Sequence, residues 1–256
     1  MPYALIAGGS KGIGFAIAEA LAKRKYDLVL VARHQDILEA AKEKLKTTYG
    51  VEVFILVFDL SKENAAAEIA EWGIKNNISF HVLCNVAGIG GAADFLNCSL
   101  PEVQYMIRLN ITSGAALTMK LLPLLQQETG ACILNVASMA AFAPIPAKNI
   151  YSATKSAVLY FSYSLRYQLK KQKISVSVLC PGPVFTKPEI EKVTIEKLGK
   201  LGKMMAVPPA RVGEIAVRGM LNKKMIIIPG VLSKIMSIIL RLLPRRLITY
   251  IYHKMG

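Results

Sequence analysis

Residues 3–24 read YALIAGGSKGIG followed by FAIAEALAKR, which is an apolar run, a glycine-rich turn and a helical pattern in succession. Gly8, Gly12 and Gly14 allow a tight turn and let backbone amides approach a pyrophosphate, and the N-terminus of the helix adds the positive end of its dipole. The spacing GxxxGxG matches neither the GxGxxG fingerprint nor a Walker A loop, and such a turn can also be purely structural. Its place between the first strand and the first helix favours nucleotide binding.

Short apolar runs continue along the chain. They are rich in Val, Ile and Leu and apolar on both faces, as strands between two helix layers are. The predicted strands are residues 3–7, 28–32, 53–58, 81–85, 132–136, 174–179 and 225–228. Helical patterns separate them, for example at 14–24, 36–49 and 152–170. This alternation predicts an α/β protein with a doubly wound parallel sheet of about seven strands and helices on both faces.

Composition excludes several classes of protein. The 256 residues are 53% hydrophobic and 19% charged, which excludes a disordered chain. No uncharged apolar stretch reaches the roughly 18 residues of a membrane span, and the start of the chain does not read as a signal peptide, so we expect a cytoplasmic protein. The cysteines show no CxxC spacing and no pairing with histidines, which predicts buried free thiols and no metal site. They are Cys84, Cys98, Cys132 and Cys180.

The net charge of +15 is concentrated near the end of the sequence. No acid follows Glu214, whereas eight cations do: Arg218, Lys223, Lys224, Lys234, Arg241, Arg245, Arg246 and Lys254. Residues 231–256 read as two basic amphipathic helices separated by Pro244. Such a segment can lie on an anionic membrane surface, or it can pack on the domain or on a second subunit. Nucleic acid is not expected as a partner, because no stacking aromatic residues interleave the cations.

The end of the second predicted strand bears on the choice of cofactor. An Asp or Glu there would accept a hydrogen bond from a free ribose 2′-hydroxyl, but the chain has Ala32-Arg33-His34. Arg33, together with Lys11 of the glycine turn, suits the 2′-phosphate of NADP(H) better than NAD(H). The alternative is that Arg33 is a solvated surface residue. Asp36 falls where the N-cap of the next helix is expected.

Residues 151–155, Tyr-Ser-Ala-Thr-Lys, open a long helical stretch. Tyr151 and Lys155 are four residues apart and therefore share one face of the helix. A nearby ammonium favours the phenolate, so the pair predicts a lowered pKa for Tyr151 and proton exchange near neutral pH. Ser138 follows the fifth predicted strand, at the edge where open α/β sheets bind ligands. A packed tyrosine beside a surface lysine is the alternative for the YxxxK pair taken alone.

Taken together, these residues resemble the short-chain dehydrogenase/reductase family over about residues 3–230, which implies a Rossmann-type fold. The resemblance rests on markers in chain order: the loop at 8–14 with Gly8, Ser10, Lys11, Gly12, Ile13 and Gly14, then Asp59-Leu60, Asn85-Val86-Ala87-Gly88, Asn110, Ser138, Tyr151, Lys155 and Pro181-Gly182-Pro183-Val184-Phe185-Thr186. The family usually shows NNAG where this chain has Asn85-Val86-Ala87-Gly88. Because Asn85 is kept, we expect the departure at Val86 to leave the ribose end of the site intact.

The resemblance implies a role for each marker. Tyr151 would be the acid/base, Lys155 would lower its pKa and bind the nicotinamide ribose, and Ser138 would polarise the substrate oxygen. Asn110 would hold a water in the proton relay, or it would merely bond backbone. Asp59 would meet the adenine, or it would cap the next helix, Asn85 to Gly88 would lie at the adenosine side, and Thr186 would meet the carboxamide. The full cofactor-binding set would be the glycine loop, Arg33, Asp59, Leu60, Asn85, Ala87, Gly88, Tyr151, Lys155, Pro181, Gly182, Val184 and Thr186.

The implied activity is hydride transfer between NADP(H) and a ketone or secondary alcohol. The sequence is similar to the general bacterial members and to the 17β-hydroxysteroid and 3-oxoacyl reductase branch of the family. Alternatives are a 3-oxoacyl-[acyl-carrier-protein] reductase, whose cationic surface would dock an acidic carrier, and a non-catalytic NADP-binding or membrane-scaffold protein. Family members commonly form dimers or tetramers, so we expect a homo-oligomer. We expect its location to be the cytoplasm, with peripheral association at the inner membrane surface.

Two further expectations concern the substrate. The resemblance places a lid at about residues 187–210, within a domain spanning 1–230, with 231–256 as an appendage. Apolar residues near the predicted site indicate a lipophilic carbonyl or alcohol substrate. They are Ile89, Phe95, Phe142, Ile145 and Phe185.

Overall fold

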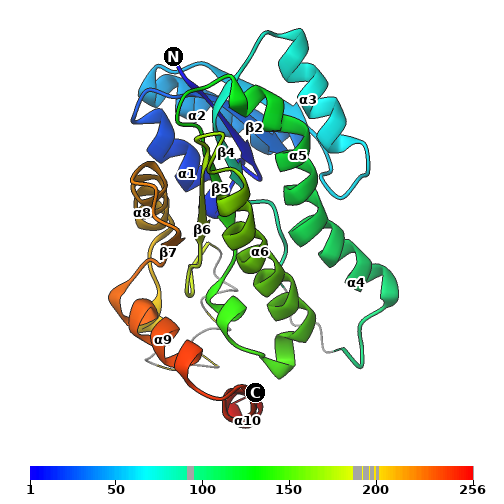
Figure 1. The fold of residues 1–256 in the computed structure, drawn as a ribbon, viewed down its shortest axis with the longest axis vertical. Coiled ribbons are helices and arrows are strands. Elements are labelled where there is room, and N and C mark those ends of the chain that lie inside the picture. The colour runs from blue at the N-terminus through cyan, green and yellow to red at the C-terminus, as the bar shows by residue number, and fades with distance from the viewer. Residues whose placement is uncertain (91–94, 187–191, 193–195, 197–198, 200–201, 256) are drawn as a thin grey trace.

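The strands of the protein form one parallel sheet. The computed structural model describes residues 1–90, 95–186, 192, 196, 199 and 202–255. Within them the strand order is β3-β2-β1-β4-β5-β6-β7, and every pairing is parallel (Figure 1). The strands are β1 (Tyr3–Ala7), β2 (Asp27–Ala32), β3 (Val53–Val57), β4 (Phe80–Asn85), β5 (Cys132–Val136), β6 (Ser175–Leu179) and β7 (Ile226–Ile227). The predicted doubly wound sheet is confirmed, and each predicted strand boundary lies within one residue of the observed one.

The described helices cover both faces of the sheet, apart from the last two, which lie beyond one end of it (Figure 1). They are α1 (Gly12–Ala22), α2 (Gln35–Tyr49), α3 (Ala65–Lys75), α4 (Leu100–Ile107), the π-helix η1 (Arg108–Thr112), α5 (Ser113–Gln126), the 3₁₀ turns η2 (Met139–Phe142) and η3 (Pro146–Lys148), α6 (Asn149–Gln168), α8 (Pro209–Leu221), α9 (Val231–Leu242) and α10 (Arg245–Met255). Asp36 lies in the first turn of α2, whose N-cap is His34, so the expected N-cap position was off by two residues.

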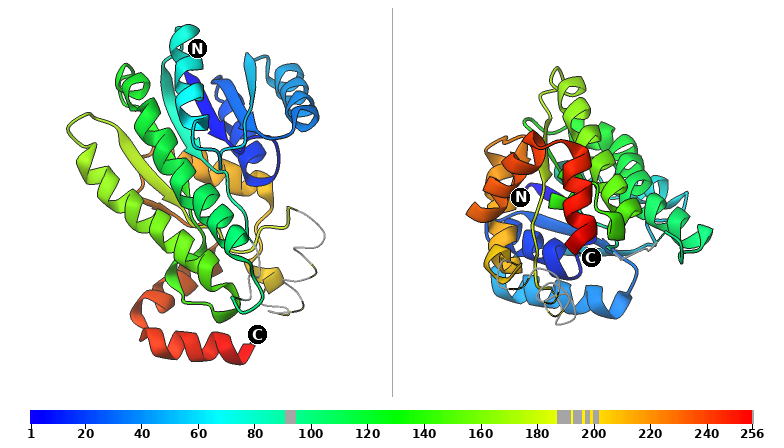
Figure 2. Two further views of the ribbon diagram at one scale, coloured as in Figure 1. Left: turned by 90° about the vertical axis from the view of Figure 1, so that its right-hand side faces the viewer. Right: turned by 90° about the horizontal axis from the view of Figure 1, so that it is seen from below.

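Alternate residues of each strand enter the two halves of the core. In β1, Ala4 and Ile6 pack with α1, α2 and α8, whereas Leu5 and Ala7 pack with α3 and α5 (Figure 2). Both faces of the sheet are therefore buried, which explains why the strands read as continuous apolar runs. Cys84, Cys132 and Cys180 are buried free thiols, as predicted, but Cys98 is only partly buried.

The order of the strands determines where a site can form. β1 pairs with β2 on one side and with β4 on the other, and all three strands are parallel. Successive strands are therefore added on one side of β1 up to β3 and on the other side from β4 onward. Ligands of open α/β sheets bind beyond the carboxyl ends of the strands at such a switch point. The loops after β1, β4, β5 and β6 all begin at this edge.

The segment after residue 230 consists of two helices on either side of Pro244, as predicted. Leu240 of α9 and Ile248 of α10 are buried in a core cluster that includes Phe142. The segment therefore packs on the domain through a small number of side chains. Among the residues that the structure describes, no helix combines the length and the apolar composition needed to cross a bilayer.

Helices α1 and α8 approach each other closely at Gly213. A Cβ atom built on Gly213 would lie 2.2 Å from the carbonyl oxygen of Ala16. The same two helices are joined by Arg24 and Glu214, whose nearest charged atoms are 2.5 Å apart. Because the obstacle is backbone, a side chain at residue 213 must push the helices apart.

We therefore expect Gly213→Ala to lower the free energy of unfolding by about 2 kcal/mol, through overpacking between α1 and α8. Urea denaturation followed by circular dichroism measures the change. The control is Gly114→Ala in α5, where a Cβ would meet Asn85 at an ordinary 3.5 Å. This control should be neutral or stabilising by up to about 1 kcal/mol. Equal effects of the two substitutions on the free energy of unfolding would show that the close approach of α1 to α8 does not restrict the size of residue 213.

Candidate active site

The glycine turn forms a cradle at the start of α1. A Cβ on Gly14 would lie 2.0 Å from the carbonyl oxygen of Gly8, so only glycine allows this tight return of the chain. Gly8 and Gly12 have φ values of +85° and +59°, a region that favours glycine. Lys11, the N-cap residue of α1, makes no side-chain hydrogen bond to the first turn. The cradle and the uncapped helix N-terminus fit the pyrophosphate of a dinucleotide.

Two other predicted segments meet this turn. A Cβ on Gly8 would lie 2.8 Å from the amide nitrogen of Ala87, and one on Gly12 would lie 3.4 Å from Cγ2 of Thr186. The loops after β1, β4 and β6 are therefore in contact. Ser10, Ile13, Gly182 and Thr186 are partly buried, whereas Leu60, Pro181 and Val184 are buried. Leu60 and Val184 belong to the hydrophobic core, where their side chains support the loops.

Arg33 and Asp59 lie near each other at the ends of β2 and β3. Arg33 is exposed, and its guanidinium donates a hydrogen bond of 2.5 Å to the hydroxyl of Tyr105 in α4. Asp59 Oδ1 accepts hydrogen bonds from the amide and hydroxyl of Ser61, at 3.0 and 2.8 Å. Burial raises the pKa of Asp59, but these bonds and the charges of Arg33 and Lys62 lower it more, so the net shift of this pKa is downward. Nothing in the sequence pointed to Tyr105.

Lys155 is the buried charge of the site. It lies on α6, its side chain is 5% exposed, and its Nζ donates a 3.0 Å hydrogen bond to the carbonyl oxygen of Val136, the last residue of β5. Burial lowers the pKa of Lys155 to about 8. A Cβ on Gly88 would lie 3.3 Å from this Nζ atom, so the loop after β4 needs glycine to pass the ammonium group.

Tyr151 lies on the same face of α6, one turn before Lys155. The Lys155 Nζ atom is 5.8 Å from the centroid of the Tyr151 ring. Burial raises the pKa of Tyr151 above its usual value, and a hydrogen bond with the Ser138 side chain offsets part of the rise. The predicted lowering of this pKa is therefore wrong, because burial of the phenol raises it by more than Ser138 lowers it. The phenol is protonated at neutral pH and available as a proton donor.

Ser138 connects β5 to the site. It is the N-cap residue of η2, and its Oγ accepts a 3.1 Å hydrogen bond from the amide of Ala140. This bond fixes the Ser138 hydroxyl, which lies close enough to Tyr151 to lower the pKa of the phenol. The two hydroxyl groups thus come together from β5 and α6, as the sequence predicted.

Asn110 holds the loop after β4 through its side-chain amide. It lies within the π-helix η1 and is buried. Its Oδ1 accepts from the amide of Ile89 at 2.8 Å, and its Nδ2 donates to the carbonyl of Ile89 at 2.9 Å and to Thr154 Oγ1 at 3.1 Å. The side chain therefore bonds backbone, the simpler of the two alternatives, and fastens the loop after β4 to α6.

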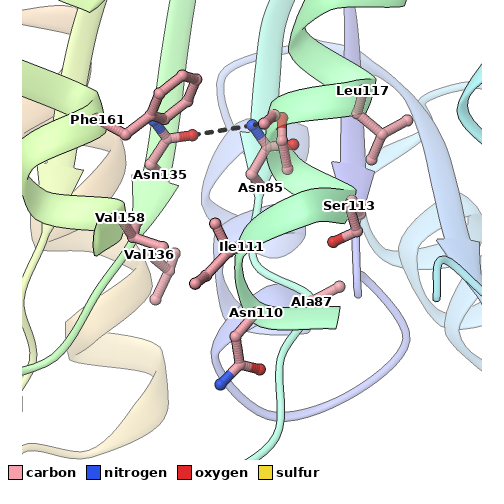
Figure 3. A pocket seen from close by; sticks show the side chains of 13 residues that line it. Asn85, Ala87, Asn110, Ile111, Ser113, Leu117, Asn135, Val136, Val158 and Phe161 are labelled. Atoms are coloured by element: carbon pink, nitrogen blue, oxygen red, sulfur yellow. Dashed lines mark hydrogen bonds between the residues drawn. The ribbon is translucent and has the colours of Figure 1, made fainter. Parts of the chain in front are cut away.

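Asn85 is also directed into the protein. Its Nδ2 donates to Asn135 Oδ1 at 2.9 Å and to Thr118 Oγ1 at 3.0 Å, which ties β4 to β5 and α5 (Figure 3). Asn85 and Asn135 line a cavity of about 20 Å³, together with Asn110, Val158 and other residues (Figure 3). The side chain of Asn85 thus supports the sheet beneath the site.

The substrate side is described only in part. Half of the expected lid, residues 187–191, 193–195, 197–198 and 200–201, lies outside the described residues. Phe142 does not line the site as expected, because it is buried in the core and its ring lies 4.7 Å from the guanidinium carbon of Arg241. Phe95 is exposed. Within the described part of the chain, no group of three or more histidine, cysteine, aspartate or glutamate side chains is arranged to hold a metal ion.

Comparison with known proteins identifies the family. Residues 2–196 match the family model described as short chain dehydrogenase, and the chain belongs to that family. It is 32% identical over 200 residues to very-long-chain 3-oxoacyl-CoA reductase-A of Danio rerio, covering 76% of this chain and 62% of that protein. The chain thus spans less than two thirds of the length of this curated relative.

Solved structures agree with the fold. L-sorbose reductase from Gluconobacter frateurii, complexed with NADPH and L-sorbose, superposes with a TM-score of 0.80 at 26% identity, covering 90% of this chain and 96% of that one. A short-chain dehydrogenase from Sphingobium yanoikuyae, in complex with NADPH, has a TM-score of 0.78 at 28% identity, covering 90% and 88%. The short-chain dehydrogenase resemblance and the Rossmann-type fold inferred from the sequence are confirmed.

The buried Lys155 makes stability depend on pH in a specific way. Below about pH 8 the lysine is charged in both the folded and unfolded states, and the full cost of burying the charge is present. Between that pH and 10.5, the usual pKa of a lysine side chain, the folded state releases its proton first. The unfolded state then binds more protons, and stability rises with pH. The wild type therefore gains stability as the pH rises, whereas a Lys155→Met variant has no such group to titrate. We expect the unfolding free energy of the variant minus that of the wild type to fall by about 2 kcal/mol from about pH 7 to about pH 10.

Urea denaturation at the two pH values measures this difference, and the subtraction cancels every other titrating group. A difference that stays constant with pH would mean that Lys155 is not held in the folded protein with a lowered pKa.

Proposed function

We propose that this protein is an NADP(H)-dependent oxidoreductase acting on a ketone or secondary alcohol of a lipophilic substrate. The observation that carries the proposal is the meeting of Ser138, Tyr151 and Lys155 at the carboxyl end of β5, beside the glycine cradle. Family membership supports it, because the family model covers the first strand to the segment beyond Tyr151 and Lys155.

The chemistry follows from the protonation states. When bound, NADPH supplies a hydride to the carbonyl carbon. Tyr151, protonated because burial raises its pKa, donates the proton to the carbonyl oxygen. The Ser138 hydroxyl holds that oxygen by a hydrogen bond. Lys155 lies one turn from Tyr151 and stabilises the phenolate that remains, and its pKa of about 8 lets it take part in restoring the proton. Asn110 positions α6 against the loop after β4 through Thr154 and Ile89.

Preference for NADP(H) over NAD(H) rests on the end of β2. Arg33 is exposed there, and Lys11 is exposed in the glycine turn, so two cations can meet a 2′-phosphate. The Tyr105 hydroxyl limits the positions open to the Arg33 guanidinium. Asp59, Ala87, Gly88 and Thr186 complete the proposed cofactor site around the cradle.

A long-chain 3-oxoacyl thioester is the substrate class that we favour. The support for this class is the similarity over 200 residues to a protein named very-long-chain 3-oxoacyl-CoA reductase-A. Phe142, one of the apolar residues expected near the site, gives no support because it lies in the core. A carrier-protein-linked 3-oxoacyl group is the less favoured alternative. A non-catalytic NADP-binding or scaffold role is disfavoured by the assembled Ser138, Tyr151 and Lys155.

The proposal includes an organisation for the whole chain. Residues 1–230 form the catalytic domain, with the lid at about 187–210, and 231–256 form an appendage. It also includes a homo-oligomer, for which the support is that α6 exposes two large aromatic side chains, Tyr160 and Tyr167.

Removal of the proposed acid gives the most direct test of the chemistry. Tyr151→Phe should lower kcat for NADPH-dependent reduction by about 10²–10⁴-fold, because only the donated proton is lost, while NADPH still binds. NADPH oxidation at 340 nm with long-chain 3-oxoacyl thioesters and ketosteroids measures the rate. The matched control is Tyr160→Phe, an exposed tyrosine on the same helix that should leave turnover unchanged. Full activity of Tyr151→Phe would refute the assignment.

Arg33 is tested through the choice of cofactor. Arg33→Ala should weaken NADPH binding by about tenfold or more and leave NADH binding nearly unchanged, because only the contact with the 2′-phosphate is lost. Titration of cofactor fluorescence gives both dissociation constants. Lys171→Ala, which removes an exposed cation beyond α6, is the control. An equal loss for both cofactors would assign Arg33 a structural role instead.

A further inference from the structure

Helix α9 turns two serines and one leucine, Leu240, toward the protein and leaves most of its aliphatic side chains exposed. Ser233 and Ser237 are 0% and 2% exposed, whereas Ile238 and Leu242 are 57% and 79% exposed. The exposed aliphatic side chains of the helix are Val231, Ile235, Ile238, Ile239 and Leu242. A helix packed on a domain normally turns its apolar stripe inward. The apolar face of α9 is therefore left for contact with something other than the domain.

Close contacts hold the helix in this orientation. A Cβ on Gly182 would lie 2.6 Å from Ser233 Oγ, so the inner face of α9 needs small residues against the loop after β6. Arg245 donates hydrogen bonds to the carbonyl oxygens of Phe142 and Leu240, at 2.7 and 2.9 Å, which fixes the corner between α9 and α10. Rotation of α9 to bury its aliphatic residues would place those larger side chains against the same loop.

Helix α10 extends the apolar face. Ile248 is buried, but Leu247, Tyr250 and Ile251 are exposed. Together with the exposed aliphatic residues of α9, these three form what we call the α9–α10 face. The two helices lie at the end of the molecule where α6 begins, and α9 contacts η2, which follows Ser138 (Figures 1 and 2). The face thus flanks the end of the sheet that carries the candidate active site.

The charge of the segment is of one sign. Lys234, Arg241, Arg245, Arg246 and Lys254 accompany the α9–α10 face, and no aspartate or glutamate follows Glu214 in the sequence. Apolar side chains bordered by cations are typical of helices that lie in the interface of an anionic bilayer. With 12 and 11 residues, α9 and α10 are too short to cross it.

We propose that the α9–α10 face docks on an anionic phospholipid membrane, with the aliphatic side chains among the acyl chains and the cations at the headgroups. A second copy of this chain fits less well, because a two-fold contact through this face would bring the same cations together without acids to pair them. Docking places the candidate active site next to the bilayer. Given the proposed function, a lipophilic substrate would then reach the site from the membrane.

Co-sedimentation with vesicles tests the proposal. The full chain should pellet with vesicles of equal parts phosphatidylglycerol and phosphatidylcholine at low salt, and much less with phosphatidylcholine alone or at high salt. The combined substitution Ile235→Ser, Ile238→Ser and Leu242→Ser should weaken partitioning by about tenfold or more. The pair Lys234→Glu and Arg246→Glu should do the same, and it spares Arg241 and Arg245, which bond within the protein.

Matched controls change the same residue types elsewhere. Ile74→Ser with Met119→Ser removes exposed apolar side chains from α3 and α5, and Lys170→Glu with Lys171→Glu reverses exposed cations beyond α6. These variants should partition like the wild type. Circular dichroism and NADPH affinity verify that each variant is folded.

Failure of the wild type to pellet with anionic vesicles at low salt would overturn the proposal. So would a dimer in sedimentation velocity that the serine variant converts to a monomer without any vesicle binding, since the face would then be a subunit interface. Equal partitioning of the face variants and the control variants would also contradict it. None of these readouts involves turnover, so such a failure would leave the proposed reductase function standing.

Discussion

The hydrogen bond from Lys155 Nζ to the carbonyl oxygen of Val136 is the contact on which the candidate site depends. It joins α6 to the end of β5 and holds a cation in a buried position, at the cost of lowering the lysine's pKa to about 8. The glycine at residue 88 and the side-chain bonds of Asn110 are arranged around this group. Tyr151, one helical turn earlier, takes its position from the same contact. A charge this deeply buried serves stability poorly, which argues that the fold keeps it for chemistry.

The parallel sheet explains why the other elements gather at one edge. Loops that leave the carboxyl ends of β1, β4 and β6 touch one another through Gly8, Ala87, Gly12 and Thr186. The same edge also carries η2, against which α9 packs. Cofactor cradle, reacting hydroxyls and the α9–α10 face therefore share one end of the molecule. This arrangement places the proposed site for hydride transfer next to the surface that we propose binds lipid. Among the described residues, no helix is long and apolar enough to span a membrane.

Local patterns sufficed for the fold and for most of the site. Runs apolar on both faces located the strands to within one residue, because burial between two helix layers leaves no polar face. The YxxxK spacing was enough to place Tyr151 and Lys155, since one helical turn fixes their shared face. Tertiary contacts decided the rest. Three features do not follow from local sequence: the hydrogen bonds of Asn110 to Ile89, the core position of Phe142 and the buried serines of α9. Each of them depends on segments that are distant in the chain.

The most direct measurement is isotope transfer from NADPH deuterated at both C4 positions to a long-chain 3-oxoacyl thioester, with the product examined by mass spectrometry. A protein that works as proposed yields a 3-hydroxyacyl product with one deuterium at the former carbonyl carbon, at a rate equal to cofactor oxidation. An unlabelled product, or tight NADPH binding with no transfer to this thioester, ketosteroids or other carbonyl substrates, would contradict the central claim that Ser138, Tyr151 and Lys155 form a reductase site.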